Sequence, residues 1–146
     1  MQQIVYAMQF HGEGAPADDG TMHAATRAPS MRITSSVGGA GLTGSIDEVD
    51  GGEATFTSVV RMTGETSFIE TGTITFGDGN SVDFSTVGEG FMGPSPQPGL
   101  LHGVISWQID SGTGQFAGAS GLITSNFTFS EQGEVIDNQF GVIWLA

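Results

Sequence analysis

The feature that most constrains the fold is an alternation of apolar and polar residues in short runs that glycine-rich turns separate. Residues 66–76 and 81–92 show it most clearly, with the turn Gly-Asp-Gly-Asn at 77–80 between them. A period of two is typical of β-strands, whereas an amphipathic helix repeats every 3.6 residues. The chain contains 24 glycines, which readily supply the positive φ angles of tight turns. The pattern therefore predicts an all-β protein built from antiparallel hairpins.

Along the whole chain the alternation predicts about eight strands plus a short extra one. The runs are residues 2–13, 29–37, 41–49, 53–62, 66–76, 81–92, 100–110, 122–130 and 135–145. Residues 14–28 have no sustained period and predict a long loop, residues 50–52 predict a chain reversal, and the proline-rich residues 93–99 predict a rim loop. We expect a single domain over residues 1–146.

A closed antiparallel β-barrel, lipocalin-like in kind, is the predicted architecture of this domain, and a β-sandwich is the alternative. The barrel is favoured because several strands carry large apolar side chains on both faces. In a barrel one face of a strand lines the interior pocket, and the other face can contact a partner outside. Closure would also pair the first and last strands, which removes exposed sheet edges.

Residues 111–121 read Ser-Gly-Thr-Gly-Gln-Phe-Ala-Gly-Ala-Ser-Gly and hold a single aromatic side chain, Phe116, among four glycines. Two alternating runs follow and end the chain. No helical pattern follows the glycines, so they are not a dinucleotide-binding loop. The segment is predicted to be a corner that delivers the last two strands, with Phe116 plugging the space under its turns.

The stretch at 112–121, Gly-Thr-Gly-Gln-Phe-Ala-Gly-Ala-Ser-Gly, resembles the corresponding corner of the allene oxide cyclase and dirigent barrels. That corner reads roughly Gly-Gly-Thr-Gly-x-Phe-x-x-Ala-x-Gly. The resemblance implies a calycin-type barrel that holds a hydrophobic small molecule, uses no cofactor and assembles as a homo-oligomer, a dimer or a trimer. In allene oxide cyclases a carboxylate on the first strand is associated with the active site, and Glu13 is the nearest acidic residue here.

The charge balance limits the partners of this chain. Sixteen acidic residues against three arginines and no lysine give a formal net charge of −13. A chain with this charge is repelled by nucleic acid phosphates and by anionic lipid surfaces. We therefore expect neither nucleic acid nor a membrane as a partner.

Several kinds of site are not expected from the residue types present. The chain has no cysteine, so disulfides, thiolate catalysis and sulfur-based metal sites are excluded. Its three histidines, His11, His23 and His102, lie far apart with no short-spaced ligand motif, and no metal or other cofactor is predicted. Residues 1–10 lack the basic and apolar segments of a signal peptide, which makes a cytoplasmic location the expectation.

The strands from 53 to 92 allow a prediction of which side chains share a face. If both hairpins are regular, Met62 opposes Ser67 and Phe76 opposes Ser81. One face then carries a set of three charged and two aromatic side chains, Arg61, Glu70, Glu89, Phe68 and Phe91. A carboxylate in an apolar pocket can act as an acid or base, while one beside arginine stays ionised. The alternative is an outward face with ordinary surface ion pairs.

Further candidates come from the first strand and from the remaining polar and aromatic positions. His11 and Glu13 lie two residues apart, which places an imidazole and a carboxylate on one strand face as a general base and its orienting group. Four side chains could line a pocket by stacking or hydrogen bonding: Tyr6, His102, Trp107 and Asn126. The alternative for each is ordinary core or rim packing.

The function that these residues and the resemblance predict is a cofactor-independent cyclase or isomerase of the natural-product type. Its substrate would be a polyene, an epoxide or a polyketide-like molecule held in the barrel lumen. The catalytic candidates are Arg61, Glu70, Glu89, His11 and Glu13. Two alternatives stay open, a carrier that binds a lipophilic ligand without chemistry, and a structural domain whose barrel is filled with side chains.

Overall fold

A computed structural model describes residues 1–146 as nine antiparallel strands and one short 3-10 turn. The elements are β1 (Gln3–Pro16), β2 (Met22–Gly38), β3 (Gly41–Met62), β4 (Ser67–Phe76), β5 (Ser81–Thr86), β6 (Gly90–Pro94), β7 (Leu100–Gly112), η1 (Gly114–Phe116), β8 (Ser120–Ser130) and β9 (Glu134–Trp144). No helix in the chain is long and apolar enough to cross a bilayer.

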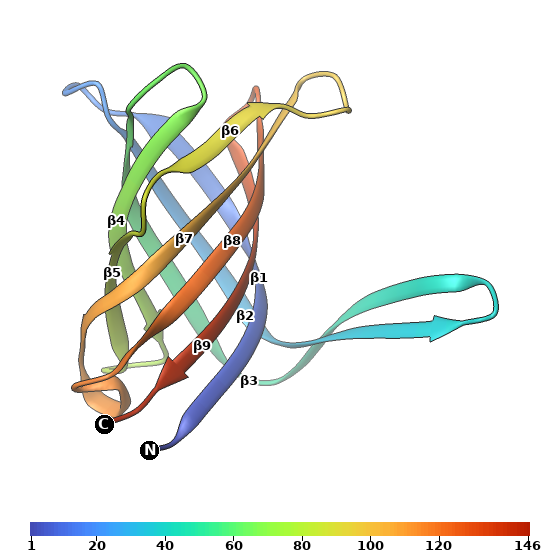
Figure 1. Cartoon of the computed structure of the whole chain (residues 1–146), viewed down its shortest axis with the longest axis vertical. Helices are drawn as coiled ribbons and strands as arrows, with labels where there is room; N and C mark the ends of the chain where they lie inside the picture. Colours follow the sequence, from blue (N-terminus) through green and yellow to red (C-terminus); the bar gives the residue numbers. More distant parts are fainter.

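Eight of the strands close into a ring. The sheet order is β3-β2-β1-β9-β8-β7-β5-β4, and a further pairing of β3 with β4 completes the circle. The short strand β6 pairs with both β4 and β7 beside β5. Figure 1 shows the tilted strands wrapping around a common axis. The prediction of an all-β barrel is confirmed, and the terminal strands β1 and β9 pair as closure requires.

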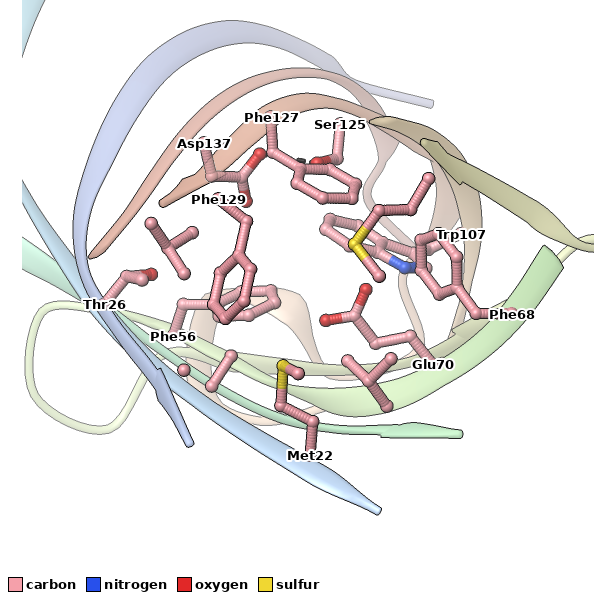
Figure 2. Close-up of a pocket in the computed structure, with 15 residues that line it drawn as sticks. Met22, Thr26, Phe56, Phe68, Glu70, Trp107, Ser125, Phe127, Phe129 and Asp137 are labelled. Carbon is pink, nitrogen blue, oxygen red and sulfur yellow. Dashed lines mark hydrogen bonds between the residues drawn. The ribbon is translucent and has the colours of Figure 1, made fainter. Parts of the chain in front are cut away.

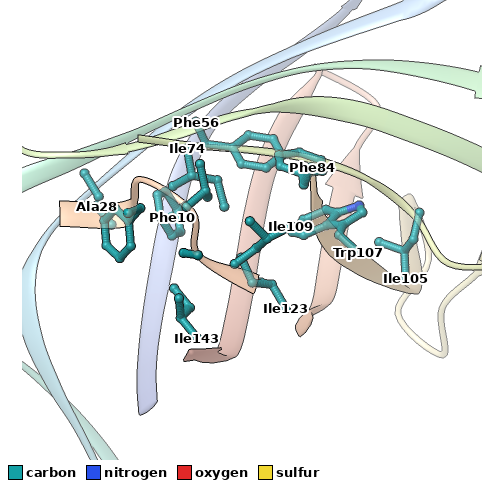
Figure 3. Close-up of a cluster of buried hydrophobic side chains, with 14 of the residues drawn as sticks. Phe10, Ala28, Phe56, Ile74, Phe84, Ile105, Trp107, Ile109, Ile123 and Ile143 are labelled. Carbon is teal, nitrogen blue, oxygen red and sulfur yellow. The ribbon is translucent and has the colours of Figure 1, made fainter. Parts of the chain in front are cut away.

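The interior is filled by alternate residues of every strand of the ring. A cluster of large apolar side chains occupies the half of the barrel near the chain termini: Phe10, Ile74, Phe84, Ile109, Ile123 and Ile143 (Figure 3). Because side chains of a strand alternate between the faces, the intervening residues point to solvent. This half of the barrel is a packed core, and the open space lies in the other half.

The corner after β7 closes the packed end of the barrel. Phe116 in η1 is 3% exposed and its ring centroid lies 5.4 Å from that of Phe76. The backbone N–H of Gln115 donates to the side chain of Asn80 at 2.9 Å, which ties the corner to the turn between β4 and β5. The structure therefore has Phe116 in the plugging position that its sequence predicts.

Replacing Phe116 with alanine is expected to destabilise the protein by about 3–5 kcal/mol, because the change leaves a cavity in the floor of the barrel. Phe91→Ala is the matched control, since Phe91 is 45% exposed on the outside and should lose much less. Denaturant unfolding of both variants measures the difference. Equal losses would show that Phe116 is not a structural plug.

Two loop predictions from the sequence are wrong. Residues 14–28 are mostly strand, since β1 runs to Pro16 and β2 begins at Met22. The inward-facing residues of β2 in this range are mostly small or weakly polar, so the sequence shows no clear alternation of apolar and polar residues. Ala28 and Thr26 nevertheless point inward and are buried. Residues 50–52 do not reverse the chain, because β3 continues through them to Met62. Instead of a turn, the pairing of β2 with β3 has a register shift between Pro29 and Met31, opposite residues 48–53.

Beyond that shift, β2 and β3 leave the barrel together as a two-stranded ribbon, which we call the arm (residues 31–48). Its strands pair from Met31–Glu48 to Gly38–Gly41. Every residue from Arg32 onward in the arm is exposed. Figure 1 shows the arm projecting sideways from the barrel wall. Only Met31, at the base of the arm, packs against the barrel, and the rest of the arm is exposed on both faces.

Candidate functional site

The candidate site is a cavity in the half of the barrel opposite the Phe116 plug. It is lined by side chains that are mainly apolar, together with Glu70, Asp137, Ser125 and Thr26. The apolar members are Met22, Ala24, Phe56, Val60, Phe68, Met92, Trp107, Phe127, Phe129 and Val135. The cavity is small, with a volume of about 50 Å³. A slim ligand fits this space better than a bulky one.

A layer of aromatic rings separates the cavity from the packed core. Trp107 lies 4.5 Å from Phe84 and 5.5 Å from Phe56 between ring centroids. On the cavity side Phe68 meets Phe127 edge to face at 5.9 Å. Contacts of this kind hold rings in fixed orientations. The cavity therefore has a rigid floor and one rigid wall.

Glu70 projects into the cavity from β4. Its carboxyl accepts a hydrogen bond of 2.5 Å from the hydroxyl of Ser58 on the neighbouring strand β3. The side chain is buried, and burial raises the pKa of Glu70 to about 8, because the apolar surroundings disfavour the charged form. The negative charge of Asp137 raises this pKa further, while the Ser58 hydrogen bond opposes the rise. At neutral pH Glu70 is therefore mainly protonated.

Asp137 projects into the cavity from β9, on the opposite side of the ring. The strands β4 and β9 are four steps apart in either direction around the barrel. The carboxyl of Asp137 accepts hydrogen bonds from Ser125 at 2.5 Å and from the amide of Gln139 at 2.9 Å. Burial raises the pKa of Asp137 to about 6, and these two donors limit the rise. At neutral pH Asp137 is mainly ionised.

Figure 2 shows the two carboxyl groups pointing into the same space from opposite walls. Their environments differ in the number of donors, one for Glu70 and two for Asp137. A pair of carboxyl groups with pKa values pushed apart in this way can supply one proton donor and one proton acceptor at the same pH. The arrangement is suited to general acid–base chemistry.

Two buried polar atoms at the cavity have no hydrogen-bond partner, the indole nitrogen of Trp107 and the hydroxyl oxygen of Thr26. Figure 2 shows the Trp107 nitrogen on the same side as the Glu70 carboxyl. Its N–H is directed at the Glu70 carboxyl and lowers the pKa of Glu70 as a hydrogen-bond donor would, but the two groups do not reach full hydrogen-bond geometry. Buried polar groups are seldom left unpaired. These two atoms are therefore available to a bound molecule.

The structure brings three of the sequence candidates to the cavity, Glu70, Phe68 and Trp107. Tyr6 lies inside the barrel as well, where its hydroxyl donates to the Gln139 side chain at 3.2 Å. Burial and the charge of Asp137 raise the pKa of Tyr6 well above its usual range. Tyr6 is thus connected to Asp137 through Gln139. The functional roles of these residues stay predictions.

Arg61 and Glu89 do not join Glu70. The register prediction is wrong by one residue, because Met62 pairs with Phe68 and Ser81 pairs with Thr75. The turn after β3 is closed by the N–H of Thr63 donating to the carbonyl of Ser67, so pairing starts one residue later. A shift of one residue moves a side chain to the other face. Arg61 consequently faces solvent, and Glu89 lies exposed in the connection between β5 and β6.

The remaining candidates lie on the outer surface. His11 and Glu13 do share a strand face, but it is the exposed outer face of β1, where His11 contacts the Gln9 side chain at 2.9 Å. Phe91 and His102 contact each other outside the barrel, with ring centroids 6.3 Å apart. Asn126 is also exposed. These side chains do not reach the cavity.

Sequence reasoning missed Asp137, Ser125, Ser58 and Gln139. In the last strand one set of alternating positions carries the large apolar residues Ile136, Phe140, Val142 and Trp144. The apolar pattern therefore favours this set as the inward face over the alternate residues. The alternate set points inward, as the burial of Asp137 and Gln139 shows. The sequence does contain a signal, because residues 137–139 of the last strand are all polar. Polar residues on both faces of a strand mean that some of them point into the barrel, and buried polar groups of this kind mark a candidate site.

No group of three or more histidine, aspartate or glutamate side chains is placed to hold a metal ion. The fold and the site define the class of protein as an all-β closed barrel with an apolar cavity and two buried carboxyl groups. Comparison with known protein families, with curated proteins and with solved structures found no match for this chain.

Proposed function

We propose that the protein is a cofactor-independent isomerase or cyclase that binds a hydrophobic small molecule in the barrel cavity. The observation that carries the proposal is the pair of buried carboxyl groups, Glu70 and Asp137, which face one apolar cavity from opposite walls. Apolar pockets with a few placed polar groups are typical of small-molecule sites. A buried carboxyl group costs stability, so its presence in a barrel core favours a functional role.

The chemistry suited to this pair is a proton shift across a bound molecule. Asp137, as the ionised member, takes a proton from a carbon beside a carbonyl group. Glu70, as the protonated member, hydrogen-bonds the carbonyl oxygen and stabilises the enolate that forms. Return of the proton from Asp137 to another carbon moves the double bond. The product has the same atoms as the substrate, and neither oxidant nor cofactor is consumed.

The unpaired polar atoms at the cavity suggest the class of substrate. The Trp107 N–H needs an acceptor, and the Thr26 hydroxyl needs a partner. A slim apolar molecule with one carbonyl or epoxide oxygen would supply the acceptor for the Trp107 N–H. Membership of the allene oxide cyclase and dirigent barrels is part of the same proposal and rests on the resemblance at residues 112–121.

The experiment uses a small cyclic ketone whose double bond lies one carbon away from conjugation. Wild-type protein is expected to move the double bond into conjugation, which absorbance follows directly, and to bind an apolar fluorescent probe that the ketone displaces. Binding without turnover would favour the alternative of a carrier. Absence of both binding and turnover would contradict the proposal.

A pair of neighbouring alanines supplies the control. Ala24 lines the cavity, whereas Ala25 is exposed on the outer face of the same strand. Ala24→Phe should fill the narrow space and abolish probe binding and turnover, while Ala25→Phe should leave both unchanged. Equal effects of the two substitutions would show that the probe binds elsewhere.

A further inference from the structure

The arm, which the proposed function does not use, has one apolar face and one polar face. On the first face Ile33 lies opposite Ile46 and Val37 lies opposite Leu42, with the small pair Ser35–Gly44 between them and Met31–Glu48 at the base of the arm. The second face carries the pairs Arg32–Asp47, Thr34–Ser45 and Ser36–Thr43. Val37 is 84% exposed and Leu42 is 73% exposed. A free two-stranded ribbon is marginally stable in water, so this apolar face needs a partner.

The outside of the barrel offers an uncharged surface, which we call the wall. It consists of the outward-facing side chains of residues 3–9, 104–108, 120–126 and 138–144, on the adjacent strands β1, β7, β8 and β9. In a chain with sixteen acidic residues, these positions include no aspartate, glutamate or arginine. Large apolar side chains are exposed there: Val5, Val104, Leu122, Phe140 and Trp144.

The strand registers make the wall continuous. Val5 pairs with Val142, and Val142 pairs with Leu122, which forms an apolar row across β1, β9 and β8. Phe140 and Trp144 lie in the adjacent rows. Contiguous apolar surface of this kind marks an interaction site. A second copy of the chain also carries a net charge of −13, so copies repel each other except where their surfaces are uncharged.

We propose that the apolar face of the arm lies on the wall of a second copy of this chain. The arm projects away from its own barrel (Figure 1), so it does not cover its own wall. Eight paired residues from Met31 to Gly38 span about 26 Å, and four adjacent strands are about 19 Å wide, so the arm can cross the wall.

The contact area reaches the minimum expected of a specific interface when the exchange is reciprocal. A ribbon about 10 Å wide and about 26 Å long covers about 260 Å². Two such contacts, counted on both partners, bury roughly 1,000 Å², which is the lower range of specific interfaces. Reciprocal exchange also closes the assembly, as homo-oligomers require.

The first test measures the molar mass of the purified protein by light scattering during size exclusion. Wild-type protein is expected to be oligomeric at micromolar concentration. The arm variant Ile33→Asp/Val37→Asp and the wall variant Leu122→Asp/Phe140→Asp should both be monomeric. Two control variants carry the same added charge at other positions and should stay oligomeric. One is Thr34→Asp/Ser36→Asp on the polar face of the arm, and the other is Thr55→Asp/Thr57→Asp on the exposed outer face of β3. Thermal unfolding confirms that each variant is folded.

The second test identifies which surfaces meet, and it uses the absence of cysteine from the chain. A Val37→Cys protein is mixed with single-cysteine wall variants at Val5, Leu122 or Phe140 under mild oxidation. A disulfide between the arm cysteine and at least one wall cysteine is expected, with none from Thr34→Cys. Cross-links only between two arms or only between two walls would overturn the proposal, as would a monomeric wild-type protein.

Discussion

The free energy of unfolding is expected to fall by about 5 kcal/mol through Glu70 alone as the pH rises from acid to mildly alkaline values. The pKa of this side chain is 4.5 in an unfolded chain and about 8 in the folded barrel, and each pKa unit corresponds to about 1.4 kcal/mol. Because the folded state holds the proton more tightly, its stabilisation is complete below pH 4.5 and is lost as the pH rises through 8. Denaturant unfolding across this range measures the loss.

Glu70→Gln separates this effect from the general repulsion of a highly acidic protein. The variant keeps a polar side chain beside Ser58 but cannot ionise. It should match the wild type at acid pH and exceed its stability by several kcal/mol above pH 8. In the variant, Asp137 should still cause a smaller decline that ends near pH 6. Glu89→Gln removes the same charge from an exposed position and should leave the wild-type profile unchanged. A wild-type profile retained by Glu70→Gln would contradict the burial argument.

The rate of the proposed proton shift is expected to be bell-shaped in pH. It should rise as Asp137 ionises through pH 6 and fall as Glu70 loses its proton through pH 8. Asp137→Asn should lower kcat/KM by about 10²–10⁴, the usual contribution of a positioned general base. Glu70→Gln should lower it by about 10²–10³ and remove the decline at high pH, because an amide still donates a hydrogen bond but more weakly than an acid.

Probe binding by these two variants is the control for the rate measurement. Both substitutions conserve the size of the side chain, so the apolar probe should bind with nearly unchanged affinity. Loss of turnover with retained binding places the two carboxyl groups in the chemistry. Turnover that is unchanged in both variants would remove them from the mechanism and leave the cavity as a binding site.

The strands and the barrel could be predicted from the sequence because they depend on local patterns. The period of two and the glycine turns mark most strand positions, and the closing corner places Phe116 under the barrel as its sequence indicates. The arm hairpin was also predictable as strands 29–37 and 41–49. The projection of this hairpin away from the barrel could not be predicted. Residues 50–52 have the composition of a turn, but they belong to the single long strand β3.

The site could be predicted only in part because it depends on register and on contacts across the ring. Glu70 was found, but its predicted partner Arg61 is on the outer face, since the hairpin pairs Met62 with Phe68. Asp137 comes from a strand whose sequence lies far from that of Glu70, and only closure of the barrel places the two opposite each other. The raised pKa values follow from this burial, which no local pattern reports.

At neutral pH the cavity is expected to hold one protonated and one ionised carboxyl group, Glu70 and Asp137. Carbon-13 NMR of the side-chain carboxyl groups, assigned with Glu70→Gln and Asp137→Asn, measures both protonation states directly. We expect Glu70 to titrate near pH 8 and Asp137 near pH 6. Titration of both groups in the ordinary carboxyl range, near pH 4, would contradict this expectation.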